Sequence, residues 1–180
     1  MRRESGDTLV EVLIATAILS AAVIAGLGIM NFGFGIILNS IERTQVQAGV
    51  NSQLSLIQYA RDAYVKAQRN GSVSGGPAIW QEITNDKTMV NYSSNVCKTD
   101  ATPSLAEKTF YVKEDGSSPL GVVPATASGN IPKAGDGLWV EAVRPSANAN
   151  YIDFYVKACW RPAAGSVNQE SRSVMRLYVP

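Results

Sequence analysis

The chain has 180 residues, with 16 basic and 15 acidic side chains and no histidine. A nearly balanced charge gives no general attraction to nucleic acid or to an anionic membrane, and the absence of histidine removes the commonest general base and the commonest zinc ligand. With no nucleophile motif either, the composition argues against an enzyme, and we expect neither a cofactor nor a metal site.

The chain begins with a short polar leader, residues 1–6, and continues as an apolar run. The leader contains two arginines, which favour a cytoplasmic N-terminus by the positive-inside tendency. From Val12 to Ser40 there is no charged residue, and these 29 residues exceed the ~20 needed to span a bilayer as a helix. We therefore predict a transmembrane helix over residues 7–40, with the remaining chain on the outer side of the membrane.

Helical spacing continues beyond the apolar run. Apolar residues recur at steps of four, four, three and seven positions: Val46, Val50, Leu54, Ile57 and Tyr64. They form one stripe of an amphipathic helix over residues 41–69. We predict a single helix from about Thr8 to Gln68, which the three glycines and the proline of residues 69–77 bring to an end.

Residues 70–180 read as a small globular head that contains β-strands. Four segments are rich in β-branched and aromatic residues: 110–112, 138–143, 151–160 and 173–179. Within the third, apolar and polar residues alternate, which is typical of an antiparallel sheet with one buried face. The predicted fold class is α+β, a long N-terminal helix with a small antiparallel sheet packed on its C-terminal half.

In the rest of the head the sequence gives fewer signals. Residues 78–137 look irregular by pattern outside the predicted strand, with Asp-Gly turns at 115–116 and 136–137. The two cysteines, Cys97 and Cys159, show no metal-ligand spacing. On the outer side of a membrane we expect them to form one disulfide, and closing a loop of about 60 residues would contribute roughly 4 kcal/mol in the chain-entropy model.

The N-terminal region resembles the type IV prepilins and the related pseudopilins. The features that carry this resemblance are a basic leader ending in Gly6, the run Thr-Leu-Val-Glu-Val-Leu (8–13), and a long apolar helix before a β-containing head. The resemblance implies that a membrane-embedded prepilin peptidase cuts between Gly6 and Asp7 and methylates the new amino terminus. The family usually has phenylalanine at this first mature position, and an aspartate there would partly neutralise the new ammonium group.

Glu11 is the one carboxylate inside the apolar run, and its presence there has two interpretations. A carboxylate at the centre of a bilayer costs about 2.5–3.5 kcal/mol, so something has to offset that cost. The resemblance implies that Glu11 assists docking into a helical filament, where it would neutralise the amino terminus of a neighbouring subunit. The alternative is a capping box, in which Thr8 caps the helix and Glu11 bonds back to its amide.

Gly26 and Gly28 also have two interpretations. In pilins the helix commonly loosens within the filament near a helix-breaking residue, often a proline, and these glycines occupy the corresponding region. Alternatively, they are small residues that allow close helix packing in lipid.

Four basic residues on the terminal hairpin form a candidate contact face: Lys157, Arg161, Arg172 and Arg176. The three readings are a solvated face, a subunit contact, and phosphate contacts of a DNA-uptake pilin.

The resemblance implies a structural subunit that waits in the plasma membrane with its head outside the cytoplasm and then joins a cell-surface pilus. Such a filament would serve adhesion, twitching motility or DNA uptake. Its partners would be identical and related subunits, the prepilin peptidase, and an assembly platform with its ATPases. The alternatives are a minor pilin or type II secretion pseudopilin and, from another class, a non-polymerising single-pass membrane protein with an extracellular binding head.

Overall fold

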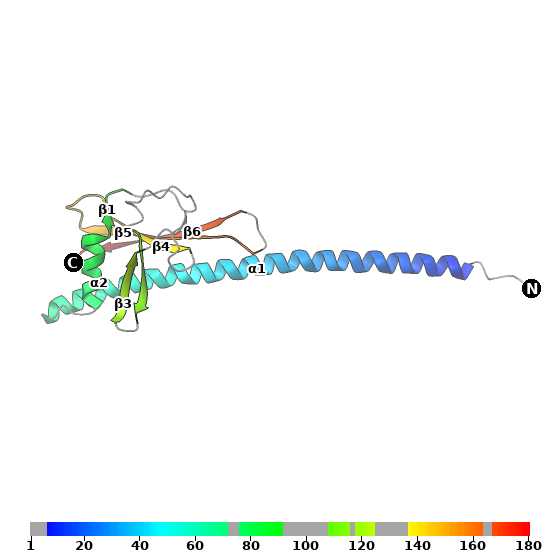
Figure 1. Ribbon diagram of the computed structural model, residues 1–180, viewed down its shortest axis with the longest axis horizontal. Helices are drawn as coiled ribbons and strands as arrows, with labels where there is room; N and C mark the ends of the chain where they lie inside the picture. Colours follow the sequence, from blue (N-terminus) through cyan, green and yellow to red (C-terminus); the bar gives the residue numbers. More distant parts are fainter. Residues whose placement is uncertain (1–6, 72–75, 92–107, 116–117, 125–136, 164–166) are drawn as a thin grey trace, which may run out of the picture. The chain divides into compact units, whose positions relative to one another are not determined.

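The structure, a computed structural model, describes residues 7–71, 76–91, 108–115, 118–124, 137–163 and 167–180. Its elements are α1 (Asp7–Asn70), α2 (Gly76–Asp86), β1 (Thr88–Met89), β2 (Phe110–Asp115), β3 (Ser118–Pro124), β4 (Leu138–Val143), β5 (Tyr151–Trp160) and β6 (Gln169–Tyr178) (Figure 1). The chain divides into two compact units, Met1–Ile41 and Glu42–Pro180, and α1 contributes residues to both.

The prediction of a long N-terminal helix is confirmed, and its observed ends lie within two residues of the predicted ones. In the first unit, every described residue belongs to α1, and this part of the helix is apolar on all sides. Such a segment is long and apolar enough to cross a membrane. In the second unit, the same helix becomes amphipathic and packs one stripe against a sheet.

The second unit contains a mixed sheet with the strand order β3-β2-β4-β5-β6, in which each neighbour is antiparallel to the next. The short strand β1 adds to β4 in parallel, with Thr88 opposite Ala142 and Met89 opposite Val143. The purely antiparallel sheet expected from the sequence is therefore wrong in this respect. A two-residue strand is too short to show any alternation of apolar and polar residues, so the sequence pattern could not reveal it.

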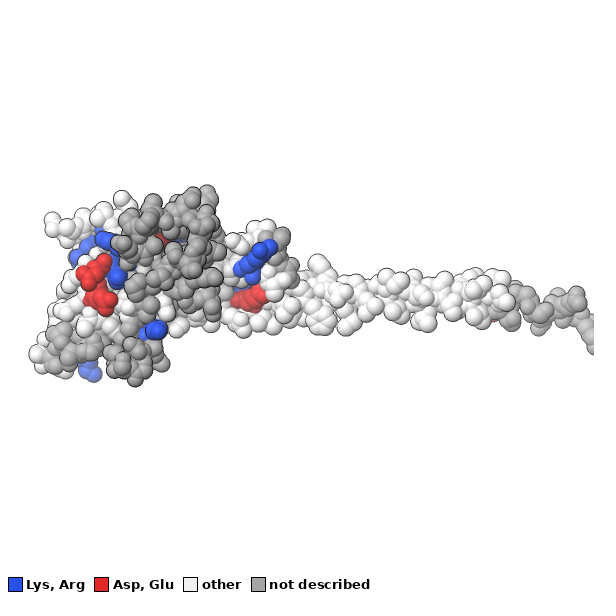
Figure 2. Space-filling view, viewed as in Figure 1, with Lys and Arg blue, Asp and Glu red and all other residues white. Residues whose placement is uncertain are grey.

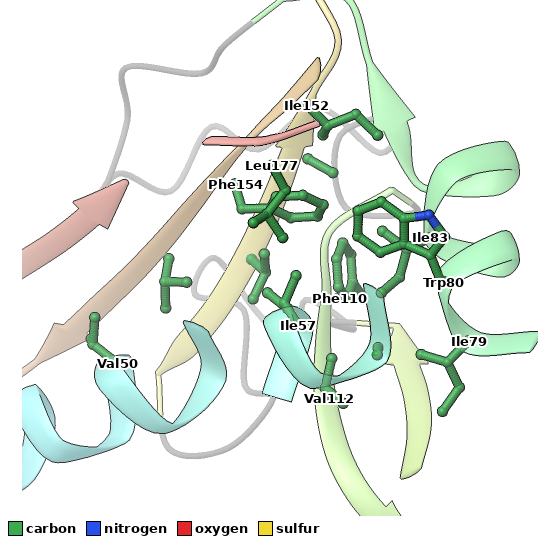
Figure 3. Packing of buried hydrophobic residues seen from close by; sticks show 14 of the residues in the cluster. Val50, Ile57, Ile79, Trp80, Ile83, Phe110, Val112, Ile152, Phe154 and Leu177 are labelled. Atoms are coloured by element: carbon green, nitrogen blue, oxygen red, sulfur yellow. The ribbon is translucent and has the colours of Figure 1, made fainter. Parts of the chain in front are cut away.

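The hydrophobic core lies between α1, α2 and one face of the sheet, which we call the inner face. Figure 3 shows side chains from these elements pointing toward one another. The cluster includes Val50 and Ile57 of α1, Ile79, Trp80 and Ile83 of α2, and Phe110, Val112, Ile152, Phe154 and Leu177 of the strands. The predicted stripe of α1 is part of it, and α2, which the sequence analysis missed, places Trp80 with its ring centroid 5.8 Å from that of Phe154.

A buried glutamine joins α1 to the sheet. The Gln53 side-chain amide donates to the carbonyl of Val112 and accepts from the amide of the same residue, both at 2.8 Å. Strand β2 pairs with β4 at Phe110. At Val112, two residues farther along β2, the Gln53 side chain takes the place of β4 as the hydrogen-bond partner of the backbone. Both backbone groups of a buried strand residue are thereby satisfied.

Candidate functional site

Glu11 lies in the first three turns of α1 with its side chain exposed. Among the residues whose side chains the structure describes, it has no hydrogen-bond or ion-pair partner. In an apolar environment such a carboxylate is costly unless a partner from outside the chain approaches it. Glu11 is therefore the candidate site of the first unit.

Two hydroxyl side chains farther along the same part of α1 are satisfied within the helix. The Thr16 hydroxyl is 3.0 Å from the carbonyl oxygens of both Val12 and Leu13, and the Ser20 hydroxyl donates to the carbonyl of Thr16 at 2.7 Å. Such bonds to the preceding turn let hydroxyls enter an apolar phase at little cost. Glu11 differs from them because its carboxylate has no donor in its own helix.

The surface around Glu11 is a continuous apolar one. Large side chains are exposed along the whole segment, among them Ile24 at 71%, Ile29 at 74% and Phe32 at 72%. Figure 2 shows this part of α1 almost entirely without charged atoms. Monomeric soluble proteins rarely expose apolar patches larger than a few hundred Å², so this surface needs a cover of lipid or of other helices.

The glycines of this segment leave open notches on the helix. A Cβ atom added to Gly26 or Gly28 would meet nothing within 4 Å. The helix is continuous through both positions. Space of this kind suits either a neighbouring helix at close range or a change of helix shape in an assembly, so both interpretations stay open.

The residues of the predicted cleavage site are only partly described. Gly6 lies outside the described residues, and α1 begins at Asp7. The cleavage between them and the methylation of Asp7 stay predictions. The helix also begins one residue before the predicted cap, Thr8, so the capping role of Thr8 stays a prediction too.

The exposed basic face expected on the terminal hairpin does not exist as predicted, because Lys157 is fully buried. Its Nζ atom lies 2.7 Å from Oε1 of Glu141, whose side chain is only 3% exposed. The same oxygen accepts a hydrogen bond of 3.2 Å from the Trp139 indole. Alternation along β5 correctly predicts that Lys157 points away from the core, but that outer face of the sheet is itself covered at this point.

The remaining basic residues of that prediction are exposed. Arg176 forms two hydrogen bonds, of 2.7 and 2.8 Å, with the carboxylate of Asp153 across the strand pair. These bonds raise the pKa of the guanidinium above its usual value and keep it charged. The Arg176 guanidinium carbon also lies 4.0 Å from the centroid of the Tyr151 ring. Arg172 neighbours Lys157 in the register of β5 and β6, and Arg161 follows the end of β5.

The ion pair of Lys157 and Glu141 was not predicted, although the sequence contains one signal for it. The outer face of β4 carries Trp139 and Val143 beside Glu141, and the outer face of β5 carries Cys159 beside Lys157. Apolar neighbours on both sides of a polar position indicate that the face is not fully solvated.

The predicted disulfide falls partly outside the described residues, because Cys97 is not among them. Cys159 is buried on the outer face of β5. The pairing therefore stays a prediction. Within the described ranges, no three acidic or cysteine side chains come together as metal ligands.

Comparisons with known proteins give no neighbour from which a role could be transferred. No protein-family model, no curated protein and no solved structure matches this chain.

Proposed function

We propose that the protein is a structural subunit of a type IV pilus-like filament, held in a membrane before assembly. The observation that carries the proposal is an exposed apolar helix surface that includes Glu11, a carboxylate without a partner among the described side chains. A lipid-covered helix satisfies the apolar surface but offers the carboxylate no cation from the protein. A bundle of identical helices covers the same surface and can bring an amino terminus to each carboxylate.

The geometry of such an assembly follows from the use of one patch on every subunit. Contacts related by a rotation and a rise do not close, so they generate an open helical fibre. The hydrophobic core is built from residues of the second unit, and the exposed apolar side chains of the first unit would supply these contacts. Adhesion, motility or DNA uptake would then depend on the exposed surface of the heads.

DNA binding is the least supported of these roles. Lys157 of the basic face proposed for it is buried in an ion pair with Glu141, and the charge of Arg176 is compensated by Asp153. On the face of the head drawn in Figure 2, acidic and basic side chains lie near one another. A field of one sign, which attracts phosphate backbones, is absent from the described part of that face.

The test separates the charge of Glu11 from its helix-capping role. Glutamine serves as well as glutamate at the third position of a capping box, so Glu11→Gln keeps the cap and removes the charge. Thr8→Ala does the reverse. We expect Glu11→Gln to be processed and held in the membrane but excluded from sheared surface filaments, while Thr8→Ala is incorporated.

Two outcomes would contradict the proposal. Parental levels of Glu11→Gln in filaments would show that the carboxylate is not needed for docking. The second check is the intact mass of the native protein, which should lack residues 1–6. The Gly6→Leu variant should keep these residues. Retention of the leader in the parent itself would favour a plain single-pass anchor with a binding head.

A further inference from the structure

The boundary between the two units coincides with the point where charge returns to the chain. The charge-free segment runs from Val12 to Ile41, the units meet between Ile41 and Glu42, and Arg43 is exposed. A helix of these 30 residues is about 45 Å long at 1.5 Å per residue. This matches the roughly 40–45 Å of a bilayer that includes its headgroup layers. In a membrane-held subunit, Glu42 and Arg43 therefore lie at the outer headgroup layer and Glu11 at the inner one.

The end of the β5–β6 hairpin is fastened to this same turn of α1. The backbone amide of Ala163 donates to Oε1 of Glu42 at 3.0 Å. One turn farther along, Trp160 lines a pocket of about 280 Å³ together with Val46 and Gly49 of α1. The end of the β5–β6 hairpin is thus held beside Glu42, the first residue of the second unit.

The side chains at this level suit a lipid–water boundary. Arg43 and Arg161 are exposed, and Val167 is 75% exposed, the highest value among the large apolar side chains of the described head. The Trp160 indole nitrogen is buried and has no hydrogen-bond partner, and the same is true of Oε2 of Glu42. Tryptophan is enriched at the headgroup level because it joins an apolar ring to one donor, and arginine binds phosphate oxygens by several parallel donors.

We propose that these residues form a membrane-proximal rim that contacts phospholipid headgroups while the subunit is held in the bilayer. The rim consists of Glu42, Arg43, Trp160, Arg161 and Val167. The inference rests on the membrane stage of the proposed function. In it, the two arginines bind headgroup phosphates, Val167 enters the interface, and the partly exposed ring of Trp160 lies at the headgroup level. Contact at the rim sets the height of the head above the membrane before assembly.

The experiment uses full-length protein in vesicles of phosphatidylcholine and phosphatidylglycerol, with a photo-crosslinking amino acid at one position. The test position is Val167 and the matched control is Val90, another exposed valine, at 67%. Val90 and Trp160 lie near different ends of β4. Val90 follows Met89, which pairs with Val143, the last residue of β4, whereas Leu138, the first residue of β4, lines the same pocket as Trp160. We expect several-fold more lipid adduct at Val167 than at Val90.

Quenching of tryptophan emission by brominated lipid provides a second readout. Trp80 and Trp139 are 1% and 3% exposed, so only Trp160 can be reached. We expect brominated lipid to quench at most the emission of one of the three tryptophans, and the Trp160→Phe variant should show no such quenching.

Each alternative result overturns the rim. Crosslinks from Val167 to a second copy of the protein, without lipid adducts, would assign this surface to a subunit contact. Equal lipid adducts at Val167 and Val90 would show unspecific contact. Carbonate extraction separates the two proposals: an inserted protein without adducts at Val167 loses only the rim, whereas a protein that is not inserted at all loses the membrane stage and the rim together.

Discussion

Replacing Lys157 by methionine should destabilise the head strongly, although the change removes a charge from a β-sheet and adds an apolar side chain of similar length. The ion pair with Glu141 measures 2.7 Å, and the two side chains are 0% and 3% exposed. Without Lys157, the carboxylate keeps the Trp139 hydrogen bond at Oε1, and Oε2 already has no partner. Breaking a buried pair by removing one member typically costs about 3–5 kcal/mol.

Thermal unfolding of the full chain in mild detergent, followed by near-ultraviolet circular dichroism, measures this cost. A domain of about 150 residues loses roughly 3 °C in Tm per kcal/mol, so the expected decrease is about 9–15 °C. The matched control is Arg176→Met, which removes a cation from an ion pair on the same face of the sheet. Arg176 is exposed to solvent, and its removal should change Tm far less.

A double variant distinguishes a stranded carboxylate from a packing defect. Lys157→Met combined with Glu141→Leu replaces the whole pair by apolar groups, which is often neutral or stabilising. We expect the double variant to recover most of the Tm lost in the single one. A single variant as stable as Arg176→Met, or a double variant that is less stable than the single one, would refute the reasoning.

Three further predictions concern the head. Gln53→Leu should cost about 2–6 kcal/mol, because it leaves two buried strand groups unpaired, and an unchanged denaturation midpoint would contradict this. Gly137→Ala should cost about 1–3 kcal/mol, since Gly137 has φ of 90° and an added Cβ would overlap the carbonyl of Cys159. Gly49→Ala should instead stabilise the protein by about 0.5–1 kcal/mol, because its Cβ meets only an ordinary contact inside a helix. Thermal unfolding that shows Tm changes of the same sign for both variants would refute this pair of predictions. Thiol labelling of the denatured, unreduced protein should find neither Cys97 nor Cys159 reactive, and two labelled thiols would exclude the disulfide.

Long and regular patterns in the sequence were sufficient for the elements that they cover. The charge-free run and the apolar stripe after it predict α1, and β4 and β5 have the predicted ends. Strand β6 begins at Gln169, earlier than the predicted residue 173, because its first residues pair with β5 at the sheet edge. These residues are polar, so the apolar pattern did not indicate a strand there. A paired edge position does not require an apolar side chain.

Helix α2 was missed because Gly76 and Pro77 were interpreted as the end of α1. Proline is favoured in the first turn of a helix, where its missing amide has no partner to lose, so the same residues can begin a helix. Ile79, Trp80 and Ile83 then have the spacing of one helical face. The glycine and the proline correctly indicate a helix boundary, but they mark the start of α2 and not the end of α1.

Two carboxylates in apolar surroundings show how differently the two units meet the cost of a buried charge. Glu141 has its partner within the chain, since Lys157 faces it across neighbouring strands and Trp139 adds a second donor. Glu11 has no donor in its own helix, while the hydroxyls of Thr16 and Ser20 beside it are satisfied. The proposed docking of Glu11 with the amino terminus of another subunit would supply the partner that its own helix does not give.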